Sequence, residues 1–310
     1  NRVGDSEDKH NPMDFALWKF KKDDAEPAWP SPWGEGRPGW HIECSAMIKK
    51  HLGDTIDIHG GGQDLVFPHH ENEIAQSEGA TGEPFVRYWM HNGFVNIDNE
   101  KMSKSLGNFF TVRDIAELFP YPVIRYFILT GHYRSPLNFS DKLLEAAQTS
   151  LQRITTCVKN LNFTIDSRKI ESTETKAIDL SDEAKLLHDG IATAKEHFIA
   201  AMSDDLNTSD ALAAIFDLVR LANSVIADPH IPVDLLEQTK DRLVELCGVL
   251  GLEVEEEEDA IPEKILALVE ERTLAKAAKD YAKADQIRDA VLAHGYRIED
   301  TAEGPRVMKE

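Results

Sequence analysis

Two lysines stand in a short, loop-like stretch at residues 101–105, which reads KMSKS and is soon followed by Gly107. Such a stretch can bring the ammonium groups of Lys101 and Lys104 onto a polyphosphate, where they neutralise charge that develops on leaving oxygens. The alternative for any K-x-x-K pattern is an exposed loop that merely carries lysines. The longer string KMSKSLGN at residues 101–108 favours the polyphosphate interpretation.

A second group of residues could bind a metal ion. His69 and Glu73 are four residues apart, so they share one face if this stretch is helical, and Cys44 lies upstream. A thiolate, an imidazole and a carboxylate would supply three of the four ligands that zinc usually takes. His70 rivals His69, because His70 and Glu73 are also neighbours at helical spacing. Without a metal, Cys44 would be a small buried hydrophobic residue and the histidines would cap or pair with carboxylates.

A third candidate site is the string HGGGQD at residues 59–64, which begins at His59. Glycines at the carboxyl end of a strand let the backbone approach a ligand closely, and α/β sheets bind ligands at that edge. Asp64 could then accept a hydrogen bond from a ribose or an ammonium group. A plain tight turn explains the glycines equally well.

The elements that must position these residues follow an α/β order. Residues 54–59 alternate like a strand, the glycines form a turn, and a helix begins near Pro68 and carries both histidines. Residues 87–96 indicate another strand that leads into the lysine stretch. Residues 1–40 are expected to be irregular, with several prolines among tryptophans.

The second half of the chain is expected to be helical. Residues 111–114 have the form of a capping box that opens a helix, with Pro122 at the first position of the next helix and Gly131 ending it. From residue 140 to about 252, apolar residues recur at helical spacing, which predicts a bundle with breaks near 166–172, 204–208 and 228–232. The residues that carry this pattern most clearly are Leu144, Ala147, Leu151, Ile154 and Val158.

The C-terminal residues predict a small mixed module after an acidic linker at residues 253–259. Its first part is helical from Pro262 to about His294, with a break near Asp280, and Gly295 stops the helix. Residues 296–300 and 306–308 could then pair as short strands.

The composition fits a globular protein of two or three domains, with 310 residues of which 42% are hydrophobic. No apolar run approaches the roughly 20 residues that span a bilayer. The polar N-terminus lacks a signal peptide and an initiator methionine, so processing or truncation is expected. The three cysteines are far apart, as in a reducing compartment. The net charge of −21 disfavours nucleic-acid binding except at a local basic patch, and it promotes solubility.

Taken together, several strings resemble the cysteinyl-tRNA synthetases of bacterial type. They are NPMDFALWK at 11–19, SPWG at 31–34, RPGWHIECSAM at 37–47, the run at 57–76, YWMH at 88–91, and the lysine stretch, which matches the second signature of class I aminoacyl-tRNA synthetases. The resemblance is dense up to about residue 140. Beyond that it rests on the domain order and on MSDDLNT at 202–208.

This resemblance implies one zinc ion per subunit, bound by Cys44, His69 and Glu73, with His69 chosen over His70. In that family the zinc binds the substrate thiolate directly, and zinc prefers a soft thiolate to the hydroxyl of serine. The resemblance also implies a monomeric cytoplasmic enzyme that uses cysteine, tRNA(Cys) and ATP with Mg²⁺. The remaining implied contacts are Trp40 over the substrate, His59 in the pocket wall, Asp64 at the substrate ammonium, and Lys101, Met102, Ser103, Lys104 and Ser105 at ATP.

The resemblance divides the chain into four segments. Residues 1–80 would be the C-terminal half of a Rossmann-like catalytic domain with the zinc site, and residues 81–139 the lysine loop with a region that contacts the tRNA stem. A helical bundle would occupy 140–255, and a small α+β domain that reads the anticodon would occupy 256–310.

The chain also departs from this family. It contains no His-x-Gly-His motif, and neither Cys157 nor Cys247 matches a ligand position. We therefore expect that it starts in the linker between the two catalytic halves, without the fourth zinc ligand, and that it is inactive by itself. One alternative is a ligase that joins cysteine to an amino sugar in mycothiol synthesis, although such ligases lack the tail at 261–310. Another is a non-catalytic fragment that binds tRNA or protein.

Overall fold

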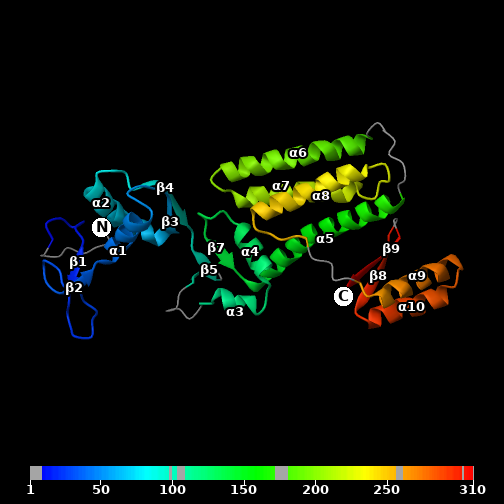
Figure 1. Cartoon of the computed structure of the whole chain (residues 1–310), viewed down its shortest axis with the longest axis horizontal. Helices are drawn as coiled ribbons and strands as arrows, with labels where there is room; N and C mark the ends of the chain where they lie inside the picture. The colour runs from blue at the N-terminus through cyan, green and yellow to red at the C-terminus, as the bar shows by residue number, and fades with distance from the viewer. Residues whose placement is uncertain are drawn as a thin grey trace. The chain divides into compact units, whose positions relative to one another are not determined.

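The computed structural model describes residues 9–97, 100–102, 109–171, 181–255, 261–301 and 304–309. The chain divides into two compact units (Figure 1). Unit 1 comprises Asn1–Asn108 with Tyr133–Asn138, and unit 2 comprises Phe109–His132 with Phe139–Glu310. Within the described residues, no helix is long and apolar enough to cross a membrane. The four-segment division from the sequence stays a prediction.

Unit 1 is built around a parallel strand pair. Strand β3 (Ile56–Gly62) pairs with β4 (Val86–Asn92), and the connection between them contains helix α2 (Glu71–Thr81). Parallel strands need such a crossover, so this is the α/β order that the sequence predicts. Helix α1 (Trp40–His51) precedes β3, and Ile48, Ile56 and Phe85 form the buried core beneath these elements.

Two expectations for unit 1 are wrong in detail. Residues 1–40 are not wholly irregular, because β1 (Trp18–Phe20) and β2 (Gly36–Pro38) form an antiparallel pair. The glycines at 60–62 do not form a turn but continue β3, opposite Met90, His91 and Asn92 of β4. As predicted, a helical stretch begins near Pro68: η2 (Val66–His70) follows the short turn η1 (Gln63–Leu65) and runs directly into α2.

The remaining strands of unit 1 form a small sheet with the order β6-β5-β7. Their bounds are β5 (Val95–Ile97), β6 (Glu100–Lys101) and β7 (Leu137–Phe139), whose last residue belongs to unit 2. The predicted strand at 87–96 is therefore two strands, β4 and β5. Lys101 ends β6 and Met102 follows it, whereas Ser103, Lys104 and Ser105 lie outside the described residues.

Unit 2 opens with helices α3 (Val112–Ala116) and α4 (Tyr121–Leu129). The predicted capping box is confirmed: the Asp114 backbone N–H donates to Thr111 Oγ1 at 3.2 Å, and the Thr111 backbone N–H donates to Asp114 Oδ2 at 2.7 Å. Pro122 stands at the second rather than the first position of α4, and the helix ends two residues before Gly131.

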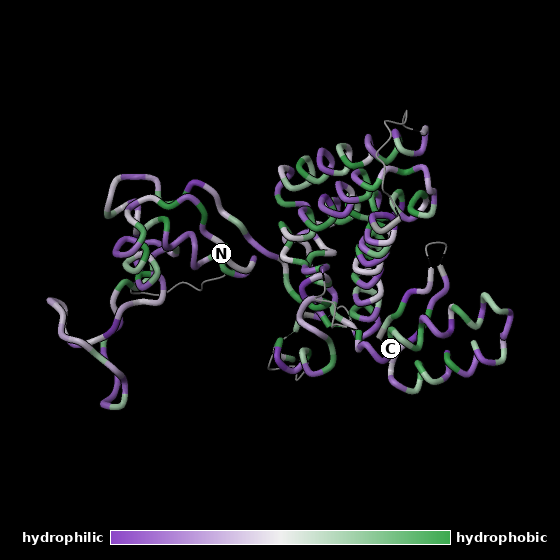
Figure 2. Tube along the Cα trace, turned by 45° about the vertical axis from the view of Figure 1, so that its right-hand side comes forward, coloured by the Kyte–Doolittle hydropathy of each residue, from purple (hydrophilic) through white to green (hydrophobic). Residues whose placement is uncertain are grey.

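The predicted helical bundle is confirmed. It contains α5 (Asp141–Glu171), α6 (Asp182–Ser203), α7 (Thr208–Val225) and α8 (Val233–Val249), which lie side by side in Figure 1. Figure 2 shows hydrophobic and hydrophilic residues alternating along their turns. All five apolar residues singled out in the sequence are buried: Leu144, Ala147, Leu151, Ile154 and Val158. The breaks at 204–208 and 228–232 separate helices as predicted. The predicted break at 166–172 is wrong over residues 166–171, because α5 continues as a helix to Glu171, and its Arg168 donates to the backbone carbonyls of Ile226 and Ile231; residue 172 lies outside the described part.

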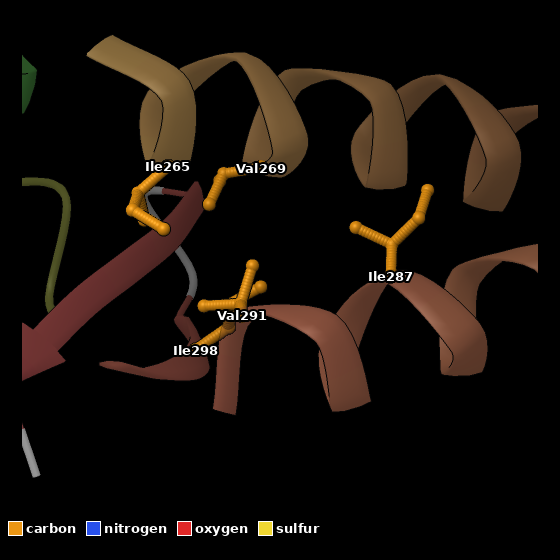
Figure 3. Packing of buried hydrophobic residues seen from close by; sticks show 5 residues of the cluster. All are labelled: Ile265, Val269, Ile287, Val291 and Ile298. Atoms are coloured by element: carbon orange, nitrogen blue, oxygen red, sulfur yellow. The ribbon is translucent and has the colours of Figure 1, made fainter. Parts of the chain in front are cut away.

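The C-terminal module is also confirmed. Helices α9 (Glu263–Ala277) and α10 (Tyr281–Ala293) flank the predicted break, and β8 (Tyr296–Thr301) pairs antiparallel with β9 (Gly304–Lys309). Figure 3 shows the apolar cluster that joins the two helices to β8: Ile265, Val269, Ile287, Val291 and Ile298. The acidic linker lies partly outside the described residues, and Val254 within it is buried.

One ion pair ties α9 to β8. Arg272, which is buried, donates to both carboxylate oxygens of Asp300 at 2.8 and 3.0 Å, and Lys276 lies 3.0 Å from the same carboxylate. These two cations, Arg272 first, hold the pKa of Asp300 well below its usual range. Because the folded pKa is depressed, the pair stabilises the module above about pH 4, the ordinary pKa of an aspartate, and this stabilisation is lost as the pH falls towards the folded pKa.

We expect Asp300→Asn to loosen this module, because it removes the carboxylate that pairs with the Arg272 guanidinium. Removing one partner of a fully buried pair costs about 3–5 kcal/mol. Asp300 is 50% exposed, and solvent screening reduces the expected loss to about 1 kcal/mol. Hydrogen exchange at the Val291 and Ile298 amides should then become several-fold faster at neutral pH.

The matched control is Asp289→Asn, since Asp289 is exposed and its nearest cation, on Arg288, is 3.9 Å away. This variant should exchange like the unchanged chain. Below about pH 4 the difference between Asp300→Asn and the unchanged chain should shrink. Equal exchange in all three proteins at neutral pH would contradict a stabilising role for the pair.

Candidate metal centre

Unit 1 brings together the three metal-ligand candidates that the sequence nominates. Cys44 Sγ lies 3.7 Å from His69 Nε2, and the same nitrogen lies 2.6 Å from Glu73 Oε1. One ligand atom from each residue lies within 4.8 Å of the others. Cys44 of α1 thus lies beside His69 of η2 and Glu73 of α2.

The local structure explains why these side chains converge. Cys44 stands one helical turn after Trp40 on α1, and α1 packs against α2. The Ser45 hydroxyl lies 3.5 Å from the Glu73 carbonyl oxygen, at the edge of hydrogen-bonding distance. Gly61 lets the histidine segment pass close to β3, because a Cβ added there would lie 2.9 Å from the His70 ring. A larger residue at this position would push η2 away from the strand.

Glu73 is the electrostatic centre of this site. Its side chain has no exposed surface, and burial raises its pKa to about 7. His69 Nε2 lies beside Oε1 and His59 Nε2 lies 2.9 Å from Oε2, yet neither oxygen has a hydrogen-bond partner in good geometry among the described residues. A buried carboxylate with orphaned oxygens is costly, and a bound cation would remove that cost.

The pKa shifts of the surrounding histidines and of the Cys44 thiol favour the neutral form of each group. Burial lowers the pKa values of His69 and His59, and it lowers the pKa of His70 to about 4. Burial and the nearby Glu73 charge both raise the pKa of the Cys44 thiol. Neutral imidazoles offer lone pairs, and a metal ion would deprotonate the thiol on binding. The cluster can therefore bind a metal cation, whereas its own histidines resist protonation to the cationic form.

This donor set fits a zinc ion. Zinc takes thiolate, imidazole and carboxylate ligands, and tetrahedral coordination places sulfur and nitrogen donors roughly 3.6 Å apart. The Cys44–His69 separation of 3.7 Å matches that spacing, whereas His69 and Glu73 at 2.6 Å would have to move slightly apart. His59, His70 and Glu73 also bring ligand atoms within 4.8 Å of one another, so His70 remains a geometric rival to His69.

The other nominated residues lie around this cluster or near it. The Trp40 indole stacks on the His69 ring at 4.5 Å and 19°, and it remains 53% exposed. His59 lies beside Glu73 as described. Asp64 is exposed in η1, where its carboxylate lies against Gly62. The structure therefore places Trp40 and His59 at the metal cluster and Asp64 on the turn that follows β3.

Two histidines at this site were missed by sequence reasoning. His41 Nδ1 lies 2.8 Å from His69 Nδ1, and His91 Nε2 lies 2.7 Å from His70 Nδ1. A signal existed for both. His41 stands three residues before Cys44, and His91 stands on the predicted strand two residues after Trp89, on the same face.

Comparisons with known proteins place this geometry in context. Residues 1–149 match the family described as tRNA synthetases class I (C) catalytic domain, and residues 197–255 match the DALR domain. The chain is 53% identical to a cysteine–tRNA ligase of Caldicellulosiruptor saccharolyticus, over 99% of the chain and 64% of the relative. It is 51% identical to a cysteine–tRNA ligase of Brevibacillus brevis, over 98% of the chain and 64% of the relative.

The chain therefore spans a little under two thirds of the length of these relatives. A solved structure with a similar fold is the ternary complex of an Agrobacterium radiobacter LeuRS with tRNA and LeuAMS. It has a TM-score of 0.54 and 18% identity, and it covers 75% of this chain and 31% of that chain. At this identity the likeness concerns the fold alone.

We expect Cys44→Ser to reduce zinc affinity, because a hydroxyl is a much harder and less acidic ligand than a thiol. Zinc content after dialysis, measured by atomic absorption, should fall well below that of the unchanged chain. In the cobalt-substituted protein, the sulfur-to-cobalt charge-transfer band should disappear.

Cys157→Ala is the matched control, since Cys157 is buried among apolar helices of unit 2 and burial raises the pKa of its thiol to about 12. It should retain both the zinc and the charge-transfer band. Unchanged zinc content in Cys44→Ser would remove Cys44 from the site.

Proposed function

This chain belongs to the cysteine–tRNA ligase family of class I aminoacyl-tRNA synthetases, and from that premise we propose that the whole protein joins cysteine to tRNA(Cys) at the expense of ATP. The observation that carries the proposal is the convergence of Cys44, His69 and Glu73 within the matched catalytic domain. The reaction would form cysteinyl-adenylate and then transfer the cysteinyl group to the tRNA.

Selection of cysteine would take place at the metal centre. Cys44, His69 and Glu73 would hold a zinc ion, which supplies a soft Lewis acid that binds a thiolate in preference to a hydroxyl. The exposed Trp40 indole above His69 would cover the bound amino acid, with His59 in the wall of the pocket. Asp64 would meet the substrate ammonium, an assignment supported by its exposed position after β3.

Activation by ATP would depend on the lysine stretch. Lys101 and Lys104 would contact the phosphates, with Met102, Ser103 and Ser105 around them and Mg²⁺ bound to the nucleotide. Ammonium groups that meet charge only as it develops accelerate the chemical step more than they tighten substrate binding. This part of the proposal rests on the sequence, since residues 103–108 lie outside the described part of the chain.

The tRNA would contact the helical part of the chain. The match of residues 197–255 to the DALR domain supports this, as does the charge of residues 261–310. That module has nine lysines and arginines against ten aspartates and glutamates, so it is nearly neutral in a chain of net charge −21. The helical and C-terminal parts favour a tRNA acceptor over an amino sugar. Three scattered cysteines fit a cytoplasmic enzyme.

The proposal is tested with the purified whole protein in two assays. Cysteine-dependent exchange of pyrophosphate into ATP should occur, serine should support little exchange, and labelled cysteine should then appear on tRNA(Cys). Exchange with cysteine but no charging of tRNA would remove tRNA as the acceptor. Equal exchange with serine would remove metal-based selection.

We expect Lys104→Ala in the whole protein to slow adenylate formation by roughly 100-fold, the loss typical of removing one transition-state donor. The Michaelis constant for cysteine should change little, because Lys104 would act on the phosphates. Single-turnover pyrophosphate release measures the chemical step. Lys185→Ala is the control, since Lys185 lies on α6 and pairs only with Asp182 among the described residues at 3.3 Å. An unaltered rate in Lys104→Ala would exclude the proposed role.

A further inference from the structure

We propose that His41 is a positioning residue for the metal centre: it accepts a hydrogen bond from His69 Nδ1–H, so that His69 presents the lone pair of Nε2 to the metal. The inference rests on the proposed metal site and goes beyond its ligands. The observation that carries it is the 2.8 Å separation between the two Nδ1 atoms.

Only one of the two Nδ1 atoms can carry the proton of this hydrogen bond, which limits the tautomers of both rings. A neutral imidazole carries one N–H, and two ring nitrogens at hydrogen-bond distance need one proton between them. If His69 donates from Nδ1, its Nε2 is free to bind a metal. If His41 donates instead, His69 holds its proton on Nε2, which then lies 2.6 Å from Glu73 Oε1. A metal ion requires the first arrangement, so His41 must be the acceptor when the site is loaded.

Helix α1 is built to hold His69 in this way. Three of its residues reach the ring from different directions: Trp40 stacks on its face, His41 meets its Nδ1, and Cys44 faces its Nε2. The His41 ring is itself braced by the edge of Phe15, at 5.7 Å and 87°. His69 is almost fully buried, so water has little access to replace a lost acceptor.

The chain contains a matched pair that serves as an internal control. His70, beside His69 in sequence, has its Nδ1 2.7 Å from His91 Nε2 on β4. The two pairs have the same chemistry but come from different elements, α1 and β4. If His69 is the ligand, His41 should control metal affinity and His91 should not. If His70 is the ligand, the dependence should be reversed.

The test uses the whole protein and measures zinc affinity by competition with a chromophoric chelator. Outer hydrogen-bond partners of metal-bound histidines typically contribute 10–100-fold in affinity, so His41→Phe should weaken zinc binding by about that factor. His91→Phe should bind zinc as the unchanged protein does. A weakened His91→Phe beside an unchanged His41→Phe would overturn the proposal and favour His70 as the ligand.

Two polar variants separate hydrogen bonding from packing. The Asn side-chain oxygen takes the position of Nδ1, so His41→Asn should keep the acceptor and bind zinc within about threefold of the unchanged protein, whereas a loss of about 10–100-fold marks a missing outer partner. His41→Gln places its amide near the position of Nε2 and should bind as weakly as His41→Phe. Equal affinities for the Asn and Gln variants would overturn the acceptor role, even if His41→Phe failed to fold.

Cobalt spectra distinguish failure of this inference from failure of the metal site. In the unchanged protein, a sulfur-to-cobalt band should be present, and it should persist at saturating cobalt in His41→Phe. Absence of the band in the unchanged protein would remove the Cys44 metal site itself, and the inference with it. A persistent band together with unweakened zinc binding in His41→Phe would overturn only the role of His41.

Discussion

Burial of the Glu73 carboxylate is the constraint on which the rest of unit 1 depends. A fully buried carboxylate must be neutralised by a proton, a cation or a full set of hydrogen bonds. Burial raises its pKa to about 7, and the imidazoles around it are themselves pushed towards their neutral forms. The histidines therefore cannot act as counter-cations at neutral pH. The site is stable in its charged form when a metal ion supplies the missing positive charge.

The packing of unit 1 brings the candidate ligands together. A metal ligand set needs side chains from separate elements to approach within a few ångströms, so the elements must pass unusually close to one another. Gly61 meets this need on β3, where a side chain would collide with the His70 ring. Helix α1 contributes from the other side, because Trp40, His41 and Cys44 lie within about one helical turn and all face the His69 ring. The hydrophobic core that supports these elements is small: its buried residues are Ile48, Ile56 and Phe85.

The sequence predicted the parts of the structure that are encoded locally. Helical spacing of apolar residues foretold the bundle, and the four-residue step between His69 and Glu73 indicated a shared face. The prediction of a turn at the glycines after His59 was wrong, because pairing with β4 overrides the preference of glycine for turns. The sequence also missed the His41–His69 and His70–His91 pairs. These residues are 28 and 21 positions apart, so only the packing of α1 and β4 brings the rings together.

The three cysteines illustrate how environment decides chemistry for one residue type. Cys157 and Cys247 lie fully buried among apolar helices of unit 2, and burial raises the pKa of each thiol to about 12. Such thiols are inert packing residues. Cys44 is only partly buried and faces the His69 imidazole and the Glu73 carboxyl, two groups that a metal ion could bind. The same side chain is therefore structural in the apolar bundle and a candidate ligand in unit 1, where a proton or a bound cation can neutralise the neighbouring Glu73 carboxylate.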